Sequence, residues 1–415
     1  MIEGRRLAGK YLRGGLIVFL AQAVVVVWGA RAYLQQHDLT DFRCFWSAGV
    51  LVSSGQSPYD VALLARVQQQ YGWDKATTGG GLYDLQPFYY PPWFALFCAV
   101  LVPLGYHNAQ LAWLVGSFEL LVVCGILLRR VLGEVPPLIS IVMVPAFGFS
   151  VLCALMGQLT PIILFSVVVA WRLLEGGWDR VAGMVLVGAT IKPDRAALLV
   201  LALFLWSASR RRWGMIQGFM AALVVLSLAS AFLWPTWPMQ MLQSTRDTPL
   251  PTEFFPWIGT TWLLVLKTLR LRGWSLWAAY LVVALPFAAV MIGTALRRSS
   301  SLADVLAVSL LAFFFVAPYS QPYDFPLLLI PLLVLVGHLR TQLARMALIL
   351  PMTFLPYLHF AYVGRMRLGW IPELSPAPKV TLFWVPLLLA CLWISSKMRG
   401  PAPAPREGLL SLSES

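Results

Sequence analysis

The sequence predicts an all-helical protein that crosses a membrane many times. Three observations favour this fold class: an apolar composition, a series of long apolar runs, and basic residues that lie between those runs. Hydrophobic residues make up 59% of the 415 residues and charged residues 12%, whereas soluble domains carry roughly 45–50% apolar and about 25% charged residues. A chain with so little polar surface cannot cover itself in water, so its solvent must be lipid.

The apolar runs give the expected helices. A helix that crosses the hydrocarbon core needs roughly 20 apolar residues. Runs close to that length lie at 14–34, 108–128, 137–155, 213–234, 275–296 and 344–362, and shorter runs lie at 91–104, 159–174, 302–317, 322–338 and 380–396. We therefore expect about 10–13 hydrophobic helices, several of them too short to span. The first run is too long for a signal-peptide core and predicts an uncleaved span.

One long run, 181–207, is interrupted by Lys192-Pro193-Asp194-Arg195. Charged side chains around a proline are costly in the middle of a helix that faces lipid. This run therefore predicts two short half-helices that meet at a buried polar turn.

The basic residues predict the orientation. The net charge is +13, but the arginines lie in short clusters between apolar runs, which is typical of cytoplasmic loops rather than of a nucleic-acid module. The clusters expected in the cytoplasm are Arg5/Arg6/Lys10/Arg13, Arg129/Arg130, Arg210/Arg211/Arg212, Arg297/Arg298, Arg340/Arg345 and Lys397/Arg399. With this orientation, residues 252–270 are expected to form an amphipathic helix at the outer surface. The same orientation places Arg365 and Arg367 on the extracytoplasmic side, against the positive-inside rule.

The expected layout is one transmembrane domain, residues 1–399, followed by a disordered cytoplasmic tail, 400–415. Its first outer loop, 35–90, holds five of the aspartates, namely Asp38, Asp41, Asp60, Asp74 and Asp84. That loop also contains amphipathic stretches at 42–54 and 61–71. A second outer loop, 235–257, is rich in proline and tryptophan, which is typical of backbone held at the interface.

Two carboxylates follow the first span. Asp38 and Asp41 share a face if that segment is helical. They could bind a cation, or one of them could act as a base toward a hydroxyl group. An ordinary polar turn, with Asp41 as a helix cap, is the alternative.

Two polar motifs border apolar runs at the outer face. Tyr90 precedes Pro91-Pro92 and is typical either of a binding residue or of an interfacial helix start. Gln158 follows a glycine and could hydrogen-bond a sugar hydroxyl, or the segment could simply be a turn.

The charged residues at membrane depth allow two interpretations. Lys192, with Asp194 and Arg195, could form a satisfied internal ion network, or it could bind phosphate. Asp324, in the segment from Pro318 to Asp324, could serve a site or cap the helix that follows.

Several classes of chemistry lack their motifs. The sequence contains no Walker motif, GxGxxG, HExxH, nucleophile elbow or metal-spaced histidine cluster, so we expect no metal and no cofactor. The five cysteines include no CxxC, and four of them lie in apolar runs, which predicts small buried hydrophobes.

Taken in order, these segments resemble the membrane glycosyltransferases of family 87 over roughly residues 14–340. The likeness rests on Asp41-Phe42 with Trp46 and Ala48, Gly55-Gln56-Ser57-Pro58-Tyr59-Asp60, Tyr90-Pro91-Pro92 with Pro103-Leu104, Gly157-Gln158, Ala182-Gly183 with Lys192-Pro193, the Arg-Arg-Trp at 211–213, and Pro318-Tyr319-Ser320 with Tyr323-Asp324. The chain differs from the family pattern at Thr160, at Asp194-Arg195 and in having no histidine near Asp324.

The resemblance implies a GT-C helix bundle in the plasma (inner) membrane, with the active site on the extracytoplasmic side. It implies inverting transfer of a mannose-like hexose from a polyprenyl-phosphate sugar to a lipid or glycan acceptor, with Asp41 as the catalytic base. The substrate-binding residues expected with it are Asp38, Tyr59, Tyr90, Gln158, Lys192, Arg195, Tyr319 and Asp324. The alternative is a transporter or flippase of lipid-linked saccharides, in which the same buried charges would line a path for substrate.

Overall fold

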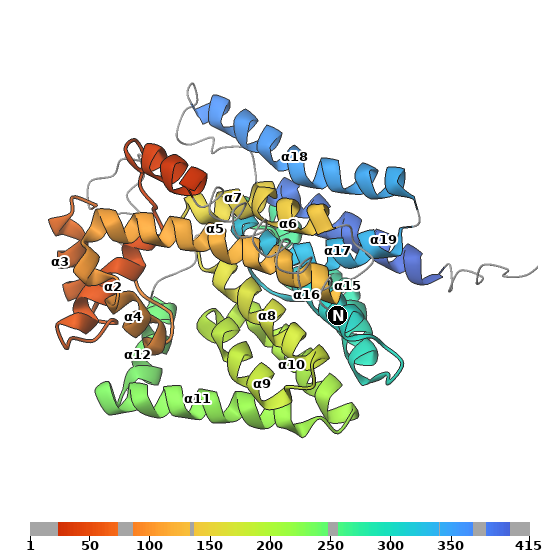
Figure 1. The fold of residues 1–415 in the computed structure, drawn as a ribbon, viewed down its shortest axis with the longest axis horizontal. Helices are drawn as coiled ribbons and strands as arrows, with labels where there is room; N and C mark the ends of the chain where they lie inside the picture. Colours follow the sequence, from red (N-terminus) through yellow and green to blue (C-terminus); the bar gives the residue numbers. More distant parts are fainter. Residues whose placement is uncertain are drawn as a thin grey trace, which may run out of the picture.

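The computed structural model describes residues 24–73, 86–132, 137–247, 256–339, 341–367 and 379–398. Over these residues the regular structure is entirely helical, which confirms the predicted all-α membrane fold (Figure 1). The tail 400–415, the first part of the first apolar run (14–23) and part of the first outer loop lie outside the described residues.

The elements follow the predicted apolar runs closely. After a helix at Val24–Leu34, the order is α2 (Phe42–Ser53), α3 (Val61–Gln70), α4 (Pro92–Ala99), η1 (Val102–Leu104), α5 (Tyr106–Val131), α6 (Pro137–Ala146), α7 (Gly148–Leu155), α8 (Thr160–Glu175), α9 (Asp179–Leu186), η2 (Val187–Ile191) and α10 (Pro193–Ser209). There follow α11 (Trp213–Leu233), α12 (Trp237–Asp247), η3 (Pro256–Ile258), α14 (Trp262–Thr268), α15 (Gly273–Leu296), α16 (Leu302–Val316), η4 (Pro322–Leu328), α17 (Leu329–His338), α18 (Gln342–Arg367), η5 (Lys379–Phe383) and α19 (Trp384–Met398).

Four helices among the described residues are long and apolar enough to cross a membrane. They are Tyr106–Arg130, Trp213–Leu233, Gly273–Leu296 and Lys379–Lys397. The helices α11 and α15 bury little of their surface within the protein, and large apolar side chains such as Phe232 and Trp274 are exposed along them. Exposed apolar surface of this extent needs lipid around it.

Two of the predicted runs are broken. Residues 137–155 form α6 and α7 rather than one span, because Phe147 has an extended backbone between them and Pro145 lies in the last turn of α6. The run 181–207 divides as expected into α9 with η2, and α10, which meet at Lys192.

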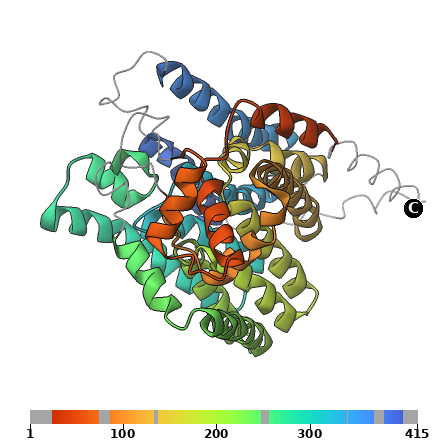
Figure 2. The ribbon, with the colours of Figure 1, turned by 90° about the vertical axis from the view of Figure 1, so that its left-hand side faces the viewer.

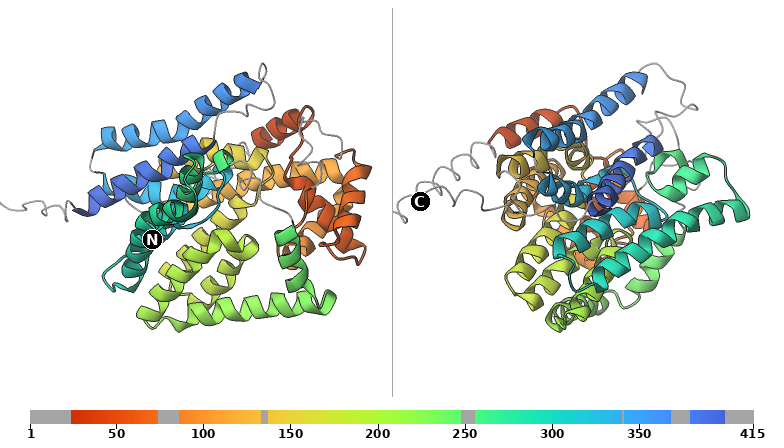
Figure 3. Two further views of the ribbon diagram at one scale, coloured as in Figure 1. Left: turned by 180° about the vertical axis from the view of Figure 1, so that it is seen from behind. Right: turned by 90° about the vertical axis from the view of Figure 1, so that its right-hand side faces the viewer.

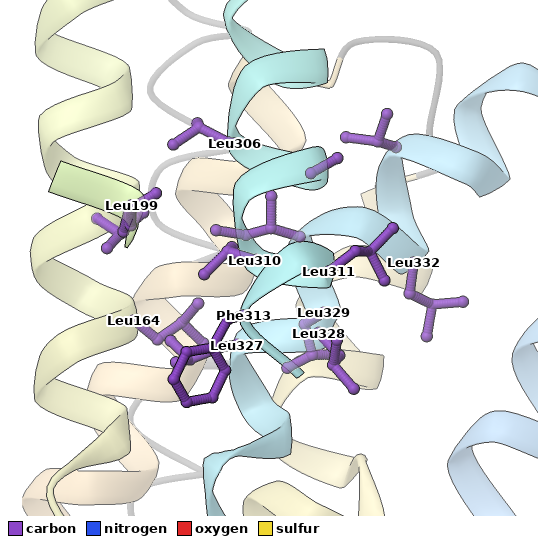
Figure 4. Packing of buried hydrophobic residues seen from close by; sticks show 14 of the residues in the cluster. Leu164, Leu199, Leu306, Leu310, Leu311, Phe313, Leu327, Leu328, Leu329 and Leu332 are labelled. Atoms are coloured by element: carbon purple, nitrogen blue, oxygen red, sulfur yellow. The ribbon is translucent and has the colours of Figure 1, made fainter. Parts of the chain in front are cut away.

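The helix α16 lies at the centre of the larger core and is buried on nearly all sides, as expected for a helix that is apolar all round. It packs against α10 and α17. Figure 4 shows Leu310 and Leu311 of α16 between Leu199 of α10 and Leu332 of α17. Of the polar residues described below, Arg195 lies on α10, Lys192 comes just before α10, and Asp324 lies in η4, which leads into α17.

Basic residues gather at one end of this scaffold. Arg210 donates hydrogen bonds to the backbone carbonyls of Ala295, Arg297 and Ser300, which joins the end of α10 to the end of α15. At the same end of the helices, Lys397 forms an ion pair with Asp304 at the start of α16 (2.7 Å). The helix α10 has 17 residues, so its first residue lies about 25 Å away from this basic end.

The predicted outer loops form a second core at the other end. The amphipathic stretches appear as α2 and α3, and α2 is more buried than expected because α4 crosses it at Gly49, where an added Cβ would lie 2.8 Å from the Cys98 backbone. Figure 2 views the molecule from this end. The second outer loop contains a helix, α12, which rises from the end of α11 toward α2–α4 (Figure 3). Ser57 donates a hydrogen bond to Gln240 of α12 (2.9 Å).

Candidate active site

Asp41 stands immediately before α2, but its side chain does not cap that helix. Its backbone N–H donates to the carbonyl of Met156 (3.0 Å), and its carboxylate oxygen Oδ2 accepts a hydrogen bond from Gln158 Nε2 (2.5 Å). Asp41 thus occupies the N-cap position of α2, but its carboxylate is bound by Gln158 and makes no capping hydrogen bond. As a residue, Asp41 is partly exposed.

Gln158 reaches Asp41 because the chain before it turns sharply. Gly157 has a φ of +75°, and a Cβ on this residue would lie 2.9 Å from Cβ of Phe42. Only glycine allows this turn to approach the start of α2 so closely. The turn leaves the Gln158 side chain buried between α2 and α10.

Lys192 fixes the orientation of the Gln158 amide. Its Nζ donates to Gln158 Oε1 at 2.6 Å, so Gln158 Nε2 must face Asp41. The ammonium group also lies 3.6 Å from Asp324 Oδ1 and 4.8 Å from the centre of the Tyr323 ring. Lys192 therefore joins the first outer loop to the segment before α17.

Asp324 is fully buried and forms ion pairs with both Lys192, just before α10, and Arg195 in its first turn. Arg195 Nε donates to its Oδ2 at 2.8 Å, and the backbone N–H of Gln321 donates to the same oxygen at 3.0 Å. The second contact is a helix cap, which confirms that interpretation of Asp324, whereas a role in a functional site stays a prediction.

Arg195 is enclosed by the protein. Besides Asp324, its guanidinium donates to the carbonyl of Tyr319 (2.9 Å), lies over the Tyr319 ring and forms an ion pair with Asp194. The side chain of Asp194 is 59% exposed, whereas that of Arg195 is 3% exposed. Arg195 thus orders the segment from Tyr319 to Asp324, and Asp194 is the accessible member of the pair.

Lys379 is a further cation at this site, which the sequence analysis missed. Its Nζ donates to Gln321 Oε1 at 3.3 Å, and its charge acts on Asp41. Lys379 precedes the apolar run 380–396 on the side opposite Lys397, where the positive-inside rule expects few cations. That position was a signal that could have identified it.

Burial raises the pKa of Asp41 above its ordinary value. The hydrogen bond from Gln158 and the positive charges of Lys192, Lys379 and Arg43 lower it in part, but the loss of hydration outweighs them. A carboxylate with a raised pKa is a stronger base than an ordinary aspartate.

The remaining predicted residues lie around this network. Asp38 accepts hydrogen bonds from Arg43 Nε (2.8 Å) and from the Tyr106 hydroxyl (2.6 Å), so its carboxylate is held away from Gln158. The Tyr59 hydroxyl donates to the carbonyl of Tyr90 at 2.6 Å, which ties together two segments of the first outer loop.

Tyr90 itself packs its ring edge-on against Phe45 and Phe94. The hydroxyl groups of Tyr319 and Tyr323 lie 3.4 Å apart, beside Arg195 and Lys192 respectively. Within the described part of the chain, no cluster of three His, Cys, Asp or Glu side chains could hold a metal ion.

In this arrangement the partly exposed Asp41 is joined through Gln158 to the buried Lys192, at the end of the helix bundle where the predicted outer loops lie. A family model, Glycosyltransferase family 87, matches residues 88–318, which is more than half of the chain. The chain belongs to glycosyltransferase family 87. No curated protein and no solved structure matches it.

Family membership makes the chain a membrane glycosyltransferase, which acts on a sugar donor and an acceptor. The matched region contains Gln158, Lys192 and Arg195, whereas Asp41 precedes it and Asp324 follows it. The structure thus brings residues from outside the matched region into contact with residues inside it.

Proposed function

We propose that this family 87 glycosyltransferase transfers a mannose-like hexose from a polyprenyl-phosphate sugar to a lipid or glycan acceptor, with inversion and without a metal ion. The observation that carries the proposal is the hydrogen bond from Gln158 to Asp41 (2.5 Å), which joins a partly exposed base to buried cations.

Asp41 acts as the general base in this reaction. It takes the proton of the acceptor hydroxyl as that oxygen attacks the anomeric carbon of the donor sugar. The bond from the anomeric carbon to the phosphate oxygen breaks, and the electron pair leaves with polyprenyl phosphate. Attack on the face opposite the leaving group inverts the anomeric configuration, and Asp41 later releases its proton to water.

The departing phosphate needs a positive charge beside it. Lys192, just before α10, is the better placed of the two nearby cations, because it is joined through Gln158 to Asp41, whereas Arg195 is held by Asp324, Asp194 and the Tyr319 carbonyl. Lys192 stands just before Pro193, the first residue of α10, where the helix dipole also favours an anion.

The place of the site in the membrane supports a lipid-linked donor. Lys192 lies about 25 Å along α10 from the Arg210 cluster, which the positive-inside rule assigns to the cytoplasm. Asp41 then faces the extracytoplasmic side, close to the depth at which the phosphate of a polyprenyl lipid is held.

The test is incubation of the purified protein with polyprenyl-phosphate mannose or glucose and a lipid extract, followed by mass spectrometry. A product that is one hexose heavier, formed by the native protein and lost with Asp41→Asn, supports the proposal. If a lipid-linked saccharide instead moves across the proteoliposome membrane and no new glycosidic bond forms, the protein is a transporter or flippase.

A further inference from the structure

The turn between α14 and α15 carries three basic side chains close together. They are Lys267 in the last turn of α14, and Arg270 and Arg272 in the turn itself. Among the described residues, none of these three side chains forms an ion pair or a hydrogen bond with the protein, and neither helix has an acidic residue in its first turn. Arg270 and Arg272 are exposed, and Lys267 is half-buried. The positive charge of this turn is therefore free to bind an anion.

The backbone of the turn holds Arg270 in an unusual conformation. Arg270 follows Leu269, the C-cap of α14, and has a φ of +64°. Its N–H donates to the carbonyl of Lys267 (3.0 Å), and the N–H of Leu271 donates to the carbonyl of Leu266 (3.2 Å). Glycine is the usual residue at this position of such a turn. An arginine here accepts strain that a glycine would avoid, which indicates that its side chain serves something other than the turn.

The first turn of α15 adds backbone donors at the same place. This 24-residue helix begins at Gly273, and Arg272 before it makes no side-chain capping hydrogen bond. The N–H groups of a first helical turn have no partner within the helix and attract anions. Three cations beside an uncapped helix start favour a ligand with several negatively charged acceptor oxygens, such as a phosphate group.

Exposed apolar side chains flank these donors. Leu269 is 65% exposed, and Trp274 and Trp277 of α15 are 85% and 48% exposed. The helix α15 is long and apolar enough to cross a membrane and buries little of its surface within the protein, so its exposed side chains meet lipid. Tryptophan is enriched at the depth of the lipid headgroups. The ligand that fits this surface has an anionic head and an apolar tail.

The basic turn lies at the same end of the molecule as the candidate active site. The N–H of Thr260 donates to the carbonyl of Ser320 (3.0 Å), and the hydroxyl of Thr261 donates to the carbonyl of Pro318 (3.3 Å). These contacts tie the start of α14 to the segment just before η4. The seven residues of α14 span about 10 Å between that segment and the basic turn. The other end of α15 is joined by Arg210 to the end of α10.

We propose that the turn between α14 and α15 binds the phosphate headgroup of an anionic phospholipid, at the end of the helix bundle where the candidate active site lies. The phosphate accepts hydrogen bonds from Arg270, Arg272 and the first N–H groups of α15, and Lys267 adds a third positive charge. The acyl chains lie along Trp274 and the apolar surface of α15. This inference concerns a lipid of the bilayer and does not rest on the proposed reaction.

The experiment locates the lipid by cross-linking. The full-length protein in phosphatidylcholine nanodiscs receives a small fraction of phosphatidylglycerol with a photoactivatable group near its phosphate, or the matching phosphatidylcholine probe. Mass spectrometry measures labelling of the peptide that contains residues 266–277. The variants are Arg270→Gly and the double variant Arg270→Gly with Arg272→Gln. The control, Arg129→Gln with Arg130→Gln, removes two exposed cations from the end of α5.

We expect the phosphatidylglycerol probe to label this peptide more than the phosphatidylcholine probe does. Arg270→Gly should lower the labelling about fivefold and the double variant about 25-fold, since each basic residue at a membrane surface contributes about a factor of five. The control should label like the native protein. Glycine adopts the turn without strain, so the melting temperature of Arg270→Gly should equal or exceed that of the native protein, and its loss of labelling cannot then come from unfolding.

Equal labelling of the turn by both probes, or unchanged labelling in the double variant, overturns the inference. It is equally overturned if Arg129→Gln with Arg130→Gln lowers labelling of this peptide as much, because the effect would then come from net charge. An excess of inorganic phosphate should not displace the probe, since the apolar contacts belong to the site. Displacement would assign the turn to free phosphate instead of lipid.

Discussion

Gln158 donates a hydrogen bond to Asp41 at 2.5 Å, although 117 residues separate the two in the chain. The same amide accepts from Lys192 through its other end, so its direction is fixed. Lys192, a buried cation, thus determines how the Asp41 carboxylate is held, although the two charged groups do not form an ion pair with each other.

Replacement of Asp41 by Asn is expected to abolish transfer while the protein stays folded. The amide keeps the shape of the carboxylate and removes its ability to accept a proton. A general base typically accelerates the reaction 10²- to 10⁴-fold, so turnover should decrease by a factor in that range. The measurements are product formation from a defined donor and the thermal melting temperature.

Asp38→Asn is the matched control for this change. Asp38 is bound by Arg43 and by the Tyr106 hydroxyl, so its loss should alter the outer loop and leave measurable activity. Near-normal turnover in Asp41→Asn would place the base elsewhere. Equal loss in both variants would point to a defect of the loop rather than of the chemistry.

The helices could be predicted well because the thickness of the hydrocarbon core sets the length of an apolar run that spans it. The positive-inside rule in turn explains why basic clusters lie between such runs. The break at Lys192 was predictable for the same reason, since charged groups around a proline are costly in lipid. The break at Phe147 was missed because the run 137–155 carries no charged residue, and Pro145, which lies in the last turn of α6, was not taken as a signal.

The site could be predicted in part. Asp41, Gln158, Lys192 and Asp324 were identified by residue type and position, and the structure brings them into one network. Their roles in the reaction remain predictions. The hydrogen bond from Tyr106 to Asp38 and the contact of Lys379 with Gln321 could not be predicted, because each joins segments far apart in the chain.

As the pH is lowered, activity should be lost at a higher pH than it would be with a catalytic aspartate of ordinary pKa. The base works only when ionised, and burial raises the pKa of Asp41, so the acid limb of kcat/KM should lie above the usual value of about 3.9. Gln158→Glu places a second carboxylate beside Asp41 and should move this limb to still higher pH.

The pH profile of kcat/KM, measured over the range in which the native protein stays folded, checks this expectation. Gln158→Leu is the control, since it removes the hydrogen bond without adding a charge and should shift the limb less. A limb that does not move in Gln158→Glu would argue that Asp41 is not the titrating group.

Asp324→Asn should destabilise the protein strongly. The carboxylate is fully buried and holds both Lys192 and Arg195. Removing one member of a buried ion network leaves uncompensated charge and costs about 3–5 kcal/mol. Asp194→Asn removes the exposed partner of the same arginine and should cost less than about 1 kcal/mol. Thermal unfolding in detergent compares the two, and similar losses would contradict the assigned roles.

Gly157→Ala tests whether the turn before Gln158 positions the base. The alanine must adopt a φ of +75°, and its Cβ would lie 2.9 Å from Cβ of Phe42. Backbone strain of this kind costs about 1–3 kcal/mol, and relief of the clash should move Gln158 away from Asp41.

Gly55→Ala is the matched control, because Gly55 has a φ of +73° but no atom within 4 Å of the added Cβ. Both variants should lose stability through strain, as seen in their melting temperatures. Only Gly157→Ala should also lower kcat with a defined donor, since only there does the clash displace a residue that holds Asp41. If the two variants lower kcat equally, the close approach of Gly157 to Phe42 does not orient the base, and the link between the turn and Asp41 must be abandoned.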